Sequence, residues 1–155
     1  MSLLVIILIL ALVLVIYFII SYQAPQHKAF HINLESDTIQ NKDYRRVIYT
    51  GPKQQLVLMS LNVSEDIPAE VHDGTQFFRI EKGKGMSSIW ENGKNSPPTN
   101  IELSDGSGLI IPPGTQHYIK NISSTEPLKL YSIYSPPQHP AGTVHNRQSD
   151  DHEHG

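Results

Sequence analysis

Between residues 30 and 136 the chain is a succession of short β-like runs separated by turn residues, and this pattern limits the fold more than any other feature. Gly, Pro, Asn and Asp, which favour turns, stand between the runs. Long helical periodicity is absent, so the pattern predicts an all-β jelly-roll barrel. We expect its strands at residues 30–34, 44–50, 54–63, 75–83, 85–92, 108–112, 117–123 and 128–134.

The N-terminus carries a different signal. Residues 3–20 form an unbroken apolar run, long enough as a helix to cross a bilayer core of about 30 Å. A cleaved signal peptide and a buried core helix are the alternatives, but no basic residue precedes the run and no small-residue cleavage pattern follows it. We therefore predict one transmembrane α-helix before the barrel, with the lipid bilayer as its partner and a single-pass membrane localisation.

Charge and composition set further limits. All 12 Lys and Arg residues follow the apolar run, beginning with Lys28, so the positive-inside tendency predicts a cytoplasmic barrel. The net charge of -3 gives no basic footprint for a nucleic-acid partner. The chain has no cysteine, so disulfides are excluded.

The length of 155 residues predicts one folded domain. We divide the chain into a transmembrane anchor at 1–22, a tether at 23–29, a barrel at 30–144 and a disordered polar tail at 145–155. The tail includes His152 and His154, which could bind metal adventitiously, but a short polar terminus is more typical of disorder.

Two segments place polar residues where a barrel lining should be apolar. Glu70, His72 and Gln76 are separated by even offsets, so an extended chain would point all three to one face, together with Phe78 and Ile80. The same alternation places Arg79 and Glu81 outside. A carboxylate, an imidazole and an amide would then share an apolar interior.

The second segment supplies another imidazole. Residues 110–113 predict a buried strand that ends in a proline turn, Gly114 provides the bend, and His117 begins the returning strand. A second strand thus delivers His117 to the interior.

These residues resemble the two motifs of the cupin superfamily. The second motif is matched at each of its fixed positions, by Gly106, Pro112, Gly114, His117 and Asn121. The first motif is matched in spacing, with Asp66, Glu70, His72, Gln76 and Gly83 at the positions where the family has Gly, His, His, Glu and Gly. The pieces around Glu70 and Gln76, and residues 135–145, also look like a mannose-6-phosphate-isomerase-like subgroup.

The resemblance implies a double-stranded β-helix with a metal site made of Glu70, His72, Gln76 and His117. Two imidazoles and one carboxylate suit one divalent ion, Fe, Mn, Ni or Zn. A neutral amide is a poor ligand, so Gln76 is a weak fourth ligand or hydrogen-bonds to a bound water. The alternatives are a rim position for Glu70, a core amide for Gln76 and a barrel that binds its ligand without metal.

The family name does not decide the chemistry, because cupins include isomerases, epimerases, dioxygenases, sensors and storage proteins. One function is a metal-dependent enzyme, isomerase-like or dioxygenase-like, acting on a small polar metabolite such as a sugar phosphate. There Glu70, if not a ligand, would be the nearest group to move a proton. The others are a non-catalytic binding module and a scaffold, since cupin barrels often form homodimers through their sheets.

Overall fold

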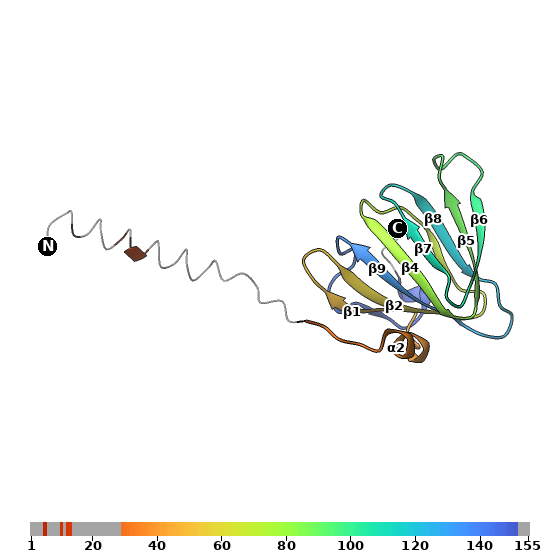
Figure 1. The fold of residues 1–155 in the computed structure, drawn as a ribbon, viewed down its shortest axis with the longest axis horizontal. Coiled ribbons are helices and arrows are strands. Elements are labelled where there is room, and N and C mark those ends of the chain that lie inside the picture. Colours follow the sequence, from red (N-terminus) through yellow and green to blue (C-terminus); the bar gives the residue numbers. More distant parts are fainter. Residues whose placement is uncertain (1–4, 6–9, 11, 14–28, 152–155) are drawn as a thin grey trace. The chain divides into compact units, whose positions relative to one another are not determined.

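The computed structural model describes residues 29–151, together with residues 5, 10, 12 and 13. The chain divides into two units, residues 1–30 and residues 31–155. The second unit contains the β-strands, which form two antiparallel sheets (Figure 1). This arrangement confirms the predicted jelly roll, which is predominantly β.

The strand order of each sheet joins segments that are distant in the sequence. The six-stranded sheet runs β10 (Val144–His145), β1 (Arg45–Thr50), β2 (Gln55–Leu61), β9 (Leu128–Ser135), β4 (Thr75–Lys82) and β7 (Gly108–Ile111). The four-stranded sheet runs β3 (Asp66–Glu70), β8 (Gln116–Asn121), β5 (Lys84–Trp90) and β6 (Thr99–Ser104). Antiparallel neighbours of this kind bury one face and leave the other for solvent.

The hydrophobic core lies on the inner faces of the strands. Met59, Leu130 and Ile80 are paired across β2, β9 and β4, and all three are almost fully buried. Ile67 and Ile119 supply the matching row on β3 and β8. Side chains that pair directly across antiparallel strands share a face, so these rows define the interior.

The strands predicted from residue 44 onward are confirmed, but the strand predicted at 30–34 is wrong. The helix α2 (Leu34–Gln40) begins there, and its N-cap Asn33 accepts a hydrogen bond from the backbone of Ser36 through its side chain (3.2 Å). This capping interaction satisfies a helix-terminal N–H and favours a helix start. Strands β3, β6 and β10 were not predicted, and β3 contains Pro68, which disfavours a strand in sequence patterns.

A buried lysine fixes the end of α2 to the six-stranded sheet. Lys129 on β9 donates hydrogen bonds to the carbonyl oxygen of Asn41, which follows α2, and to Ser60 Oγ (2.8 Å). Burial lowers the pKa of Lys129, with further lowering from Lys82 and Lys42. The two acceptors compensate for the loss of hydration.

The C-terminal segment differs from the disordered tail predicted at residues 145–155. Strand β10 pairs with β1, and a single 3-10 turn follows at Gln148–Asp150. Asp151 then forms an ion pair with Arg45 Nη1 (2.5 Å). The buried guanidinium needs a partner, and the tail supplies the carboxylate. Residues 152–155 lie outside the described residues.

The predicted transmembrane anchor at 1–22 and tether at 23–29 lie outside the described residues, apart from residues 5, 10, 12, 13 and 29. Among the residues described, no helix has both the length and the apolar character required to cross a membrane. Helix α2 has 7 residues, whereas a span needs roughly 20. This finding contradicts the predicted single-pass membrane localisation with a cytoplasmic barrel.

Candidate metal centre

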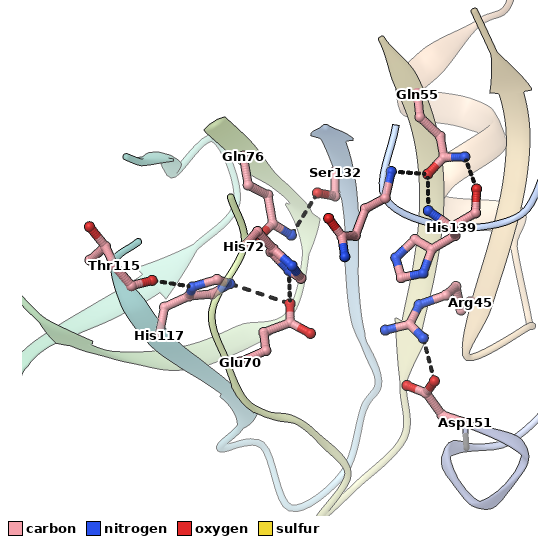
Figure 2. Close-up of polar contacts among 11 residues, drawn as sticks. Arg45, Gln55, Glu70, His72, Gln76, Thr115, His117, Ser132, His139 and Asp151 are labelled. Atoms are coloured by element: carbon pink, nitrogen blue, oxygen red, sulfur yellow. Dashed lines mark hydrogen bonds and ion pairs between the residues drawn. The ribbon is translucent and has the colours of Figure 1, made fainter. Parts of the chain in front are cut away.

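Three of the predicted ligands meet inside the barrel. Glu70 ends β3, His72 lies in the link between β3 and β4, and His117 lies on β8 (Figure 2). Each offers a ligand atom, and these atoms all lie within 4.8 Å of one another. All three residues are buried. The cluster could therefore hold a metal ion.

The alternation of side chains along the chain explains how Glu70 and His72 come together. Both are buried, whereas Val71 between them is 54% exposed. The even-offset argument is confirmed for this pair and for Phe78 and Ile80, which are buried too. Glu81 was expected to be exposed but is buried, and its carboxylate forms an ion pair with the guanidinium of Arg79.

His117 is held in one tautomer by the backbone. Its Nδ1 lies 3.0 Å from the carbonyl oxygen of Thr115. A carbonyl oxygen can only accept, so Nδ1 carries the proton of the neutral ring and Nε2 keeps its lone pair. Nε2 is the atom that faces Glu70, as Figure 2 shows. Such a hydrogen bond on the outer nitrogen is the usual support of a metal-ligating histidine.

Glu70 lies between the two imidazoles. Its Oε1 is 3.0 Å from His72 Nε2 and 3.3 Å from His117 Nε2. With Nδ1 of His117 protonated, a neutral His117 places a lone pair opposite the carboxylate. A proton or a cation between these atoms would turn that repulsion into attraction, and a divalent ion would serve all three side chains together.

Gln76 lies on the inner face of β4, opposite Tyr134 of β9. Its Nε2 donates to Ser132 Oγ (3.0 Å), which fixes the orientation of the amide. Its Oε1 is buried and has no hydrogen-bond partner among the described residues. The ring of Tyr134 in turn contacts that of His72 (5.4 Å between centroids). Gln76 thus borders the cluster, and its role as a fourth ligand stays a prediction.

Aromatic rings pack around the two imidazoles. The centroid of Phe78 is 5.6 Å from that of His117, and the centroid of His139 is 5.1 Å from that of Tyr134. Burial raises the pKa of Tyr134, and the negative charge of Glu70 raises it further. Tyr134 therefore remains a neutral phenol beside the cluster at ordinary pH.

The last residue of the second motif has a structural role. Asn121 Nδ2 donates to the carbonyl oxygens of Leu61 (3.0 Å), Asn62 (3.0 Å) and Glu126 (2.9 Å). These bonds join β8 to the end of β2 and to the loop before β9. Asn121 holds the strand that carries His117, without belonging to the cluster.

Sequence reasoning missed Arg45, Tyr134 and Ser132 on the inner face. Arg45 has the same parity as the buried Val47, which is a signal that its side chain points inward. Tyr134 and Ser132 share their parity with the buried Leu130 in the same way. No sequence signal indicated that Asp151 would reach Arg45.

Comparison with known proteins gives one family. The family model described as "Cupin domain" matches residues 57–134. An uncharacterized protein of Acanthamoeba polyphaga mimivirus is 47% identical over 124 residues, which cover 79% of this chain and 75% of the viral protein. The uncharacterized protein YrkC of Bacillus subtilis is 43% identical over 126 residues, covering 79% of this chain and 66% of YrkC.

Solved structures agree with the fold. A crystal structure of a Bacillus halodurans protein is 39% identical, has a TM-score of 0.76, and covers 81% of this chain and 95% of the solved one. An RmlC-like cupin with a double-stranded β-helix from Methanocaldococcus jannaschii has a TM-score of 0.54 at 17% identity, covering 73% of this chain and 94% of the solved one. The second likeness concerns the fold alone.

Proposed function

The chain belongs to the cupin family, and on that premise we propose that its barrel binds one divalent metal ion through Glu70, His72 and His117 and offers the ion to a small polar metabolite. The observation that carries this proposal is the position of Glu70 Oε1 between the two imidazole Nε2 atoms. The carboxylate and the two imidazoles form a ligand set that suits a divalent ion, and their ligand atoms all lie within 4.8 Å of one another.

The ligand set suits Fe, Mn, Ni or Zn. The NH2 group of Gln76 donates a hydrogen bond to Ser132 Oγ. The amide oxygen of Gln76 then adds a weak fourth ligand or accepts a hydrogen bond from a water on the ion. Three protein ligands leave coordination positions for a small molecule, and a bound ion would polarise an oxygen of that molecule as a Lewis acid.

The proposed metabolite is small, polar and hydroxylated, such as a sugar phosphate. The enzymatic form of this function is an isomerase-like or a dioxygenase-like reaction. The resemblance to a mannose-6-phosphate-isomerase-like subgroup supports the isomerase-like reaction. Glu70 cannot both ligate the ion and move a proton freely. A non-catalytic binding module uses the same site, and homodimer formation through the sheets stays compatible with either function.

Elemental analysis of the purified protein, followed by titration of the metal-free protein with Mn, Fe, Ni and Zn, tests the proposal. We expect one ion per chain. His72→Ala and His117→Ala should each lower the affinity by at least about 100-fold, since each removes one of three strong ligands, whereas Gln76→Ala should lower it by no more than about 10-fold.

Two controls exclude other histidines. His31→Ala removes an exposed imidazole outside the strands, and a chain ending at Asp151 removes His152 and His154. Both should keep the stoichiometry. A wild-type barrel that contains no metal and binds none of the four ions would reject the metal site and favour a metal-free binding module.

A further inference from the structure

A second charged pair lies inside the barrel, apart from the metal cluster. Arg45 Nη1 lies 2.5 Å from Asp151 Oδ1, and the exposed fractions of the two side chains are 0% and 3%. His145 Nδ1 lies 3.5 Å from the same oxygen. Figure 2 shows the guanidinium turned toward the carboxylate of Asp151. A guanidinium without water is stable only with acidic partners.

Arg45 belongs to the inner face of the six-stranded sheet. It pairs directly with Met59 on β2, and Met59 pairs with Leu130 on β9. Both neighbours are fully buried core residues. An aliphatic residue would fill this place in the row, so the guanidinium needs a reason beyond packing.

Arg45 and the metal cluster both lie inside the barrel (Figure 2). Burial lowers the pKa of Arg45, but electrostatic interactions with Tyr134 and with the carboxylates of Asp151 and Glu70 outweigh this and raise it above its ordinary value. Tyr134 also contacts the ring of His72. The guanidinium of Arg45 and the carboxylate of Glu70 therefore lie in the same barrel interior, and Arg45 stays positively charged there.

The partner carboxylate comes from a short terminal segment and not from the barrel strands. Strand β10 has 2 residues, and the 3-10 turn after it has 3. Beyond β10, the contacts of this segment include the ion pair of Asp151 and a hydrogen bond from the Gln148 side chain to Asp66 Oδ1 (2.5 Å). A short segment outside the main strands opens locally more readily than the strands of the core.

We propose that Arg45 is an anion-binding residue of the barrel interior and that Asp151 occupies the place of a carboxylate on the natural ligand. The proposal deepens the proposed function, on which its link to the metal rests. It narrows the metabolite to a small carboxylic acid whose remaining oxygens reach the ion. Guanidinium matches a carboxylate geometrically, because its planar N–H groups can bind both oxygens.

Chemical rescue tests the anion site. Asp151→Ala should lower the melting temperature by about 10 °C, because it leaves a buried cation without its carboxylate. Sodium acetate should restore at least half of this loss in a saturable manner, whereas sodium chloride at the same ionic strength should not. Asp150→Ala removes an equal charge from the adjacent residue and should show no acetate-specific gain.

A second substitution and a second readout keep the test decisive. Asp151→Ala combined with Arg45→Met should lose the acetate effect, since no guanidinium remains. If Asp151→Ala does not fold in buffer, the folded fraction after refolding is measured by circular dichroism against acetate concentration, and it should rise with acetate but not with chloride. Absence of rescue in both formats would overturn the proposal, and Asp151 would then be a structural partner only.

The link to the metal has its own measurement. In Asp151→Ala loaded with Mn²⁺, the methyl protons of acetate should relax faster than with Zn²⁺, and His117→Ala should abolish the difference. Rescue by acetate without this faster relaxation would refute the proposal that the anion bound at Arg45 lies close to the metal ion. The rescue experiment requires no metal, so a failure of the metal site would leave the anion site standing or falling on its own result.

Discussion

The backbone N–H of Gly114 donates a hydrogen bond to the carbonyl oxygen of His72 across 2.8 Å. Gly114 lies in the turn between β7 and β8, just before His117. The bond therefore connects the β3–β4 link, which carries His72, to the turn that precedes His117. It joins the first sequence motif to the second. Gly114 has a φ of 74°, a conformation that favours glycine.

Gly114→Ala should therefore affect both stability and the site. We expect a loss of about 1 kcal/mol in the free energy of unfolding, measured in urea, because alanine is strained at positive φ. The affinity for Zn²⁺ should also fall severalfold, since strain in this turn shifts the His72 carbonyl. Gly106→Ala is the matched control, because Gly106 has a φ of 81° and equally open surroundings. Equal affinities in the two variants would contradict this coupling.

The hydrogen bond between Gln76 and Ser132 gives a second prediction. Ser132→Ala frees the amide to rotate, and we expect the metal affinity to fall by up to about 10-fold in a competition titration. Gln76→Glu should raise the affinity, because it adds a charged ligand oxygen beside the cluster. Ser87→Ala removes another buried hydroxyl, one without a hydrogen-bond partner among the described residues, and should leave the affinity unchanged. A matching loss in that control would disprove the role of Ser132.

Asn121 should prove a stabilising residue and not a ligand. Asn121→Ala removes three hydrogen bonds to buried or half-buried backbone carbonyls, and we expect a loss of about 3 kcal/mol in the free energy of unfolding. The stoichiometry of metal in the folded fraction should stay at the wild-type value. Asn100→Ala, on the exposed side of β6, should cost less than about 0.5 kcal/mol. A loss of metal from folded Asn121→Ala would show that this expectation is wrong.

Tyr118 gives a pH-dependent prediction. Burial, together with its hydrogen bond to Asp66 Oδ2 (2.8 Å), raises the pKa of Tyr118 to about 12 from 10.0. The unfolded chain releases this proton first, so the stabilisation is complete below pH 10 and is lost as the pH rises toward 12. Between these values, urea denaturation should show stability falling less steeply in Tyr118→Phe than in the wild type. Parallel slopes would show that the hydroxyl does not titrate in this way.

Much of the fold and of the site could be predicted from sequence because local alternation carries the information. The spacing of Glu70 and His72 placed both inside, and the second motif placed His117 on the returning strand. Local alternation could not reveal the irregularity between Ile80 and Lys82, because it depends on pairing with Lys129 of a distant strand. Nor could it reveal Asp151, whose order depends on a guanidinium far away in the chain.

The pairing of β2 with β9 has a consequence for how the barrel is made. Strand β2 lies between β1 and a strand that is synthesised much later, so most contacts of the larger sheet are distant in sequence. High contact order of this kind slows folding, because loop closure must precede the favourable contacts. During vectorial synthesis the early strands must wait for β9 to leave the ribosome. Until then, the edge of β2 lacks its partner strand, and unpaired strand edges of this kind are prone to aggregation.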